Sequence, residues 1–144
     1  MPIYPSKEEV LDAVNNMVFD KNMKILSKKL WLTKAHIDNH GKRLYYFLGL
    51  LLLDNPVFSF TKIDFGTKYY YDSKHDILGI DENNPSLVST LHEMCHKLYG
   101  HDELTAQSKA VAIFKKVFPE VYDKCHFEGH MLKLNKCSKS PPEQ

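Results

Sequence analysis

Residues 84–119 predict two consecutive helices joined by a single tight turn. Asn84 can act as the N-cap of the first helix, and Pro85 can take the first position, where a missing N–H costs nothing. Gly100 can end this helix in a left-handed conformation, and Asp102 can cap the next. The apolar residues at helical spacing are Leu87, Val88, Leu91, Cys95 and Leu98 in the first helix, and Ala106, Ala110, Phe114 and Val117 in the second. Helix, tight turn, helix is therefore the expected order of this part of the chain.

The rest of the chain predicts further helices and a short sheet. A capping box, with Ser6 as N-cap and Glu9 reaching back, begins a helix over about 6–19. The apolar run at 42–53 predicts a buried helix. Strand patterns separated by turn residues follow within 57–65, 67–72 and 76–81. We therefore expect an α+β fold: N-terminal helices, a short and mostly antiparallel sheet, and then the helix pair.

Length and composition are those of one ordinary globular domain. The chain has 144 residues, 43% of them apolar and 26% charged, with a net charge of +1. A chain of this size can bury its own core, so we expect a single domain over 1–144, its motif-bearing part at about 57–119 and a frayed polar tail at 138–144. No signal-peptide pattern is present, and the longest apolar run is too short to cross a membrane. Three cysteines without paired spacing predict no disulfide framework, so we expect an intracellular protein with no membrane partner.

A metal-binding pattern lies on the first helix of the pair, in the sequence "LHEMCHKLYG". His92 and His96 are one helical turn apart, so both imidazoles leave the same side of the helix. One zinc ion can take a nitrogen from each, at about 2.0–2.1 Å. Glu93 lies about 100° around the helix from His92, where it can flank the ion without binding it. We therefore expect a Zn²⁺ site in which His92 and His96 are ligands and Glu93 is the catalytic general base.

Two other histidine pairs have the same spacing. They are His36/His40 and His126/His130, and neither contains the internal glutamate. Gly129 also weakens any helix over the second pair. We interpret all four as ordinary surface or core histidines.

Spacing alone does not fix the third protein ligand. In a continuous helix His101 would point about 140° away from His96, but Gly100 permits a positive φ that can fold the chain back. Glu103 shares a face with the buried alanines of the second helix, and a buried carboxylate needs a partner, either the metal or a histidine ligand. Asp102 is better used as the helix cap. The chemistry ranks His101 first, Glu103 second and Asp102 third.

The sequence "LHEMCHKLYGHDEL" resembles the SprT-like zinc metallopeptidases, the family that includes the Spartan proteases of DNA–protein crosslink repair. The family pattern is HExxH on a helix, a variable loop, and Gly-His followed by a helix. Within about 87–118, the matching residues are His92, Glu93, His96, Gly100 and His101. The resemblance implies a small zincin-like domain, three histidine ligands to zinc and a glutamate general base. The loop before the third histidine is shorter than in the family, Thr105 stands where an aromatic residue is usual, and no cysteine-rich zinc ribbon follows.

These features predict a zinc-dependent endopeptidase acting on a protein or peptide substrate. Glu93 deprotonates a water on the zinc, which attacks the scissile carbonyl, and then returns the proton to the leaving amine. Tyr99, Tyr122 or a free histidine can supply the oxyanion donor. Residues 103–106 also look like the E-x-x-A of the glutamate-ligand zincins, so a minimal peptidase of that type is an alternative. A non-enzymatic alternative closes the zinc with a fourth ligand, Glu103 or His126, as a structural staple in a binding module.

The most basic stretch of the chain is Lys21–Arg43, which also contains Trp31. A solvated helix face is the simpler interpretation. The alternative is a nucleic-acid contact surface, with DNA-associated proteins as substrates. The basic residues are Lys21, Lys24, Lys28, Lys29, Lys34, Lys42 and Arg43, and Lys124, Lys133, Lys136 and Lys139 would extend such a surface.

Overall fold

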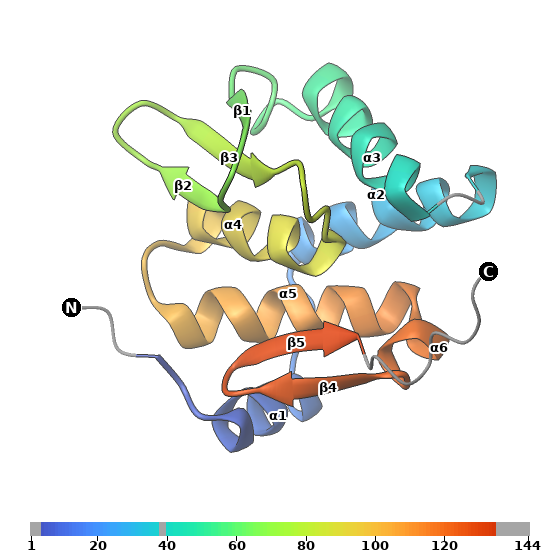
Figure 1. The fold of residues 1–144 in the computed structure, drawn as a ribbon, viewed down its shortest axis with the longest axis vertical. Helices are drawn as coiled ribbons and strands as arrows, with labels where there is room; N and C mark the ends of the chain where they lie inside the picture. Colours follow the sequence, from blue (N-terminus) through green and yellow to red (C-terminus); the bar gives the residue numbers. More distant parts are fainter. Residues whose placement is uncertain (1–3, 38–39, 135–144) are drawn as a thin grey trace.

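The computed structural model describes residues 4–37 and 40–134, and Figure 1 shows how their elements are arranged. The helices are α1 (Lys7–Asn15), α2 (Lys21–His36), α3 (His40–Asp54), α4 (Leu87–Tyr99), α5 (Glu103–Val117) and α6 (Pro119–Tyr122). The strands are β1 (Lys62–Gly66), β2 (Tyr70–Asp72), β3 (Ile77–Asp81), β4 (Cys125–Glu128) and β5 (Met131–Leu134). The α+β class expected from the sequence is confirmed. Residues 138–144, for which a frayed tail was expected, lie outside the described residues.

Helices α4 and α5 lie side by side at the centre of the fold (Figure 1). The three-stranded sheet covers α4, while the β4–β5 hairpin lies on the far side of the helix pair from that sheet. Helices α1 and α2 pack against α5, and α3 packs against α2. The buried residues at the centre are Leu91, Met94 and Cys95 of α4 and Ala106, Ala110 and Ile113 of α5. The two predicted apolar stripes are therefore confirmed, and the alanines let the two helices approach closely.

Local hydrogen bonds set the helix boundaries. The predicted capping box begins α1, but this helix ends at Asn15 rather than near residue 19. The prediction that Asn84 caps α4 is wrong: the cap is Ser86, whose hydroxyl accepts the Ser89 N–H at 3.2 Å. The phenol of Tyr69 explains the shift, because it donates to the Asn84 carbonyl at 2.9 Å and accepts the Ser86 N–H at 2.7 Å. A tertiary contact therefore holds residues 84–86 outside the helix.

The larger sheet is mixed, not mostly antiparallel. Its strand order is β1-β3-β2, with β1 parallel and β2 antiparallel to β3. The strand predicted from residue 57 begins only at Lys62, since the side chain of Asn55 accepts the Val57 N–H and holds the preceding segment in turns. Alternating polarity predicts that a strand exists, but not which edge of its neighbour it pairs with. The parallel pairing of β1 with β3 could therefore not be predicted from the sequence pattern.

The β4–β5 hairpin was not predicted. Its strands have four residues each, and the turn between them contains Gly129 with a φ of 64°. Such short strands carry little alternation, which explains the omission. The hairpin matters for function because its turn contacts the centre described below.

A hydrogen-bonded carboxylate fastens the sheet to α4. Asp76, in the turn between β2 and β3, accepts Lys97 Nζ of α4 at 2.8 Å and the Tyr71 hydroxyl at 2.7 Å. Its positive φ of 53° is a conformation that aspartate tolerates better than most residues. This contact holds β2 over one side of α4.

None of the helices in the described part of the chain has the length and apolar character that a membrane span requires.

Candidate metal centre

Three side chains from two helices converge on one point. His92 and His96 leave the same face of α4, and Glu103 reaches them from the first turn of α5. The His92 and His96 Nε2 atoms lie 3.1 Å apart, and the Glu103 carboxylate oxygens lie 3.1 Å from the first nitrogen and 3.3 Å from the second. All three side chains are largely shielded from solvent, with 9%, 11% and 16% of their area exposed. Within the described residues they form one potential metal-binding group.

The turn between the helices explains why the carboxylate reaches the imidazoles. Gly100 has a φ of 96°, which glycine adopts readily, and its N–H bonds back to the His96 carbonyl at 3.0 Å. Asp102 then caps α5, as predicted, by accepting the Thr105 N–H at 2.9 Å. These two local signals confine the reversal to residues 100–102 and place Glu103 at the start of α5. The predicted tight turn is therefore confirmed.

Both histidines are held by their second ring nitrogen. The Nδ1 of His96 lies 2.8 Å from the Gly100 carbonyl oxygen, which can only accept, so this Nδ1 carries the proton. The Nδ1 of His92 lies 2.6 Å from the Gln107 side-chain oxygen, while the Gln107 amide nitrogen donates to the His130 carbonyl at 2.8 Å. The Gln107 oxygen is thus also an acceptor. In their neutral forms, both imidazoles therefore direct an unprotonated Nε2 at the same point.

Three electron-pair donors facing one another repel unless a cation or a proton lies between them. Burial lowers the pKa of His92, which disfavours the proton. Tetrahedral coordination with bonds of about 2.0–2.1 Å separates the ligand atoms by about 3.3 Å. The two Nε2 atoms lie 3.1 Å apart, and His92 Nε2 lies 3.1 Å from Glu103 Oε1 and His96 Nε2 3.3 Å from Glu103 Oε2, all close to that value. The geometry and the donor types are therefore those of a small metal site with two nitrogen ligands and one oxygen ligand.

Glu93 lies beside this group without belonging to it. It is half-buried on α4, and it lines the same cleft as His92 and His96. Burial raises the pKa of its carboxyl to about 7. A carboxyl with that pKa exchanges protons at neutral pH, which is what a general base and acid requires.

The raised pKa makes a prediction about the stability of the metal-free protein. Between about pH 4.5 and 7 the folded protein holds a proton on Glu93 that the unfolded chain has lost, so the free energy of unfolding falls as pH rises through this range. Glu93→Gln removes this loss because an amide does not ionise. We expect the variant to match the wild type at pH 5 and to exceed its stability at pH 8 by about 1–3 kcal/mol. Thermal unfolding in excess chelator measures this, with exposed Glu82→Gln as control, and an equal difference at both pH values would contradict it.

Several predicted site residues lie elsewhere. His101, ranked first as third ligand, is exposed; it lines the cleft but is not a member of the converging group. Asp102 serves as the α5 cap. Tyr99, one of the candidate oxyanion donors, instead donates its hydroxyl to Asp20 at 2.7 Å. His126 lies 2.8 Å from Glu128 on the hairpin, and the ring of His130 stacks on Tyr4 at 4.8 Å.

Gln107 is the functional residue that sequence reasoning missed. It is 1% exposed and joins His92 to the turn of the β4–β5 hairpin. The available signal was a long polar side chain among the apolar positions of α5, a helical turn after Glu103. Its partner lies fifteen residues away, so no local pattern reveals the contact.

The centre opens into a cleft with a volume of about 580 Å³. One wall carries the consecutive tyrosines Tyr69, Tyr70 and Tyr71, and the other carries His130 and Met131 at the hairpin. The ring of Tyr70 lies directly against Gly79, where a Cβ atom would overlap it. The hydroxyl of Tyr70 donates to Asp64 at 2.6 Å. The sheet therefore fixes the aromatic wall of the cleft.

Comparisons with known protein families, curated proteins and solved structures find no match to this chain. The site is therefore interpreted from its own geometry.

Proposed function

We propose that this protein is a zinc-dependent peptidase with His92, His96 and Glu103 as the metal ligands. The observation that carries the proposal is the convergence of two unprotonated imidazole nitrogens and a carboxylate at tetrahedral spacing. Two histidines and one glutamate suit zinc, and three protein ligands leave the fourth position open for chemistry. A zinc ion held there would supply a Lewis acid that acidifies water and polarises a carbonyl oxygen.

The chain itself supplies the proton transfers and the orientation of the ligands. Glu93 accepts a proton from the attacking water and delivers it to the leaving amine, two steps that its pKa of about 7 allows. The Gly100 carbonyl and Gln107 hold the two imidazoles in one tautomer and one orientation. The cleft above α4 accommodates an extended peptide with its scissile bond beside these groups.

The ligand set bears on the class of peptidase. With Glu103 as third ligand, the site belongs with the glutamate-ligand zincins, whereas the SprT-like resemblance assigns this role to His101. A zincin-like domain is common to both alternatives and is part of the proposal. The position of Glu103 beside both imidazoles favours the glutamate set.

A structural staple is the competing function for the same residues. A staple needs four protein ligands, and the group formed by the described residues has three. His126, a candidate fourth ligand, lies beside Glu128 on the hairpin instead. Glu93, half-buried next to the group, has no function in a staple. These observations favour a catalytic centre.

Metal removal tests the proposal. We expect about one zinc per chain by elemental analysis and hydrolysis of an unstructured protein such as casein. Dialysis against a chelator should abolish hydrolysis, and one equivalent of zinc should restore it. Hydrolysis that persists without metal, or zinc-loaded protein that cleaves neither casein nor a peptide mixture, would reject the peptidase.

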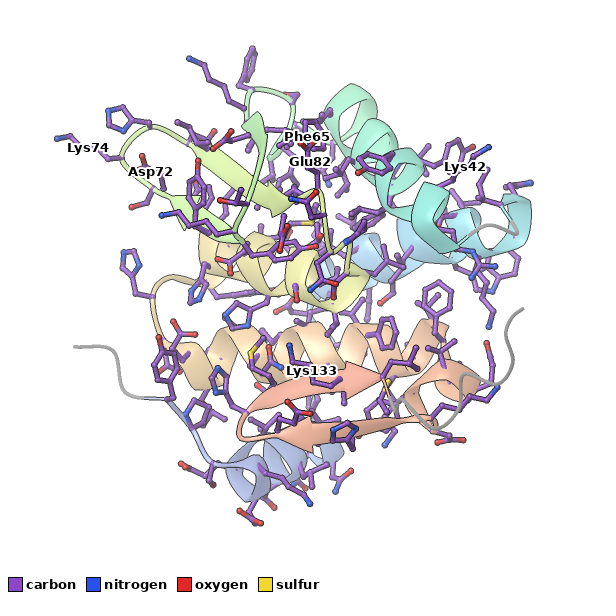
Figure 2. All side chains as sticks on the ribbon, in the orientation of Figure 1. Lys42, Phe65, Asp72, Lys74, Glu82 and Lys133 are labelled. Atoms are coloured by element: carbon purple, nitrogen blue, oxygen red, sulfur yellow. The ribbon has the colours of Figure 1, made fainter. Side chains whose placement is uncertain are left out.

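Nucleic-acid binding is a second candidate activity, and one face of α2 favours it. Lys21, Lys24, Lys28 and Trp31 are exposed at intervals of three or four residues, so they share one side of the helix. Lys42, labelled in Figure 2, is an exposed lysine of α3, the helix that packs against α2. Lysines around an exposed indole offer charge for phosphates and a surface for stacking. We propose that this face binds nucleic acid and brings DNA-associated proteins to the cleft.

Salt dependence tests that contact. We expect affinity for a DNA duplex to fall steeply between 50 and 200 mM salt, on the order of tenfold or more for a few phosphate contacts. Lys24→Ala/Lys28→Ala should weaken binding to all sequences alike, because phosphate contacts carry no sequence information. Lys68→Ala/Lys74→Ala, two exposed lysines near the sheet, is the matched control. Absence of binding at 50 mM salt would contradict the nucleic-acid contact and leave the peptidase proposal unchanged.

A further inference from the structure

A second cavity adjoins the cleft of the metal centre. It has a volume of about 520 Å³ and lies between the N-terminal turn of α4 and strand β5. Tyr69, Ser89 and Met131 line both hollows, so the two meet at these residues. The floor is one face of α4, which continues from Ser89 to His92 and His96 at helical spacing.

The distance between the two hollows matches the spacing of a peptide. The turn Ser86–Ser89 lies about 5–9 Å along the helix axis from His92, at about 1.5 Å per residue. An extended chain advances about 3.3 Å per residue. A peptide that runs along α4 with its scissile bond at the metal centre therefore places a side chain two or three residues away over the second cavity.

The lining of the second cavity selects for apolar groups. Aliphatic and aromatic side chains contribute most of it: Leu44, Leu87, Val88, Phe114, Val121 and Leu132. Two of its polar groups are already paired: the Tyr69 hydroxyl bonds to Asn84 and Ser86, and the Asp81 carboxylate accepts the Asn83 N–H at 3.1 Å. Asp81 and Lys133, the latter labelled on β5 in Figure 2, are of opposite sign and favour neither an anion nor a cation. A ligand with a large apolar side chain gains most from burial there.

We propose that this cavity is a specificity pocket for one large apolar side chain of the substrate, within three residues of the cleaved bond. The proposal rests on the peptidase function because it calls the bound group a substrate side chain. The apolar lining predicts that such a group binds whether or not the protein is a peptidase. Residues 135–144, which follow the lining strand β5, contain no Leu, Ile, Val, Met, Phe, Tyr or Trp and so offer the pocket no large apolar side chain.

Binding of single residues tests the pocket without any turnover. We would titrate the full zinc-loaded chain with N-acetylphenylalaninamide, N-acetylleucinamide and N-acetylaspartamide, and follow backbone amide resonances by NMR. We expect the first two to shift the amides of 86–89 and 131–134 and to bind at least about tenfold more tightly than the third. Equal affinities, or shifts confined to other parts of the chain, would overturn the pocket.

An exposed residue of the lining allows a matched pair of variants. Leu134 is 56% exposed, so Leu134→Asp should leave the fold intact while placing a charge at the pocket. Val57→Asp makes the same change at a 42% exposed site that lines neither hollow. We expect Leu134→Asp to weaken N-acetylphenylalaninamide about threefold to tenfold, and Val57→Asp to have no effect. The same loss in both variants would count against the pocket.

Cleavage of a randomised peptide mixture then separates the two proposals. Enrichment of Phe, Leu or Met at one position within three residues of the cut supports both. Cleavage without such enrichment overturns the pocket and leaves the peptidase. Selective binding of the apolar amides by a protein that cleaves nothing overturns the peptidase and leaves the pocket.

Discussion

Replacing Glu103 by alanine should strip zinc from the protein, whereas replacing His101 should leave zinc bound. The Glu103 carboxylate lies 3.1 and 3.3 Å from the two imidazole nitrogens, and its loss leaves a site with two ligands. His101 is exposed outside that group. Elemental analysis and competition with a chromophoric chelator measure the difference. We expect His92→Ala and His96→Ala to behave like Glu103→Ala.

Variants of Gln107 should lower zinc affinity by intermediate amounts. Gln107→Leu removes the acceptor of the His92 Nδ1–H, and loss of such an outer contact lowers metal affinity about 10–100-fold. Gln107→Glu keeps an acceptor and should retain more affinity. Glu82→Ala, an exposed carboxylate remote from α5 in sequence, is the control for charge. Full zinc in Glu103→Ala together with loss in His101→Ala would instead establish the three-histidine set that the SprT-like resemblance implies.

Glu93→Gln should keep one zinc per chain while kcat/KM for peptide hydrolysis falls by about 10²–10⁴-fold. The carboxylate is outside the ligand group, so the metal and the fold stay, and only the proton acceptor is lost. Steady-state kinetics on a quenched fluorescent peptide, with zinc content measured on the same samples, separate the two effects. Glu82→Gln should retain wild-type kinetics, since that side chain lies on the surface and does not line the cleft. Unchanged turnover in Glu93→Gln would reject this residue as the general base.

Local patterns predicted the elements that carry the site. Helical spacing placed His92 and His96 on one side of α4, and the capping preference of Asp102 fixed the start of α5. Gly100 ended the helix with a positive φ, as a residue without a Cβ can do. The boundary error at Asn84 arose because a distant phenol, Tyr69, competed for the same backbone. The helical spacing, the Asp102 cap and the Gly100 turn each involve only a few neighbouring residues, which is why spacing and residue type predict them, whereas the Tyr69 contact does not.

The chain by itself therefore determined the helix pair, the turn, the two histidines and the position of Glu93. The tertiary structure decided the remainder: that Glu103 rather than His101 faces the imidazoles, that Gln107 orients one of them, and that β2 and β5 enclose a groove over α4. The physical reason is the range of the contacts. A helix has a fixed rise and rotation per residue, but the direction in which a chain leaves Gly100 depends on how α5 packs against α4, and that packing is set by side chains from the whole core.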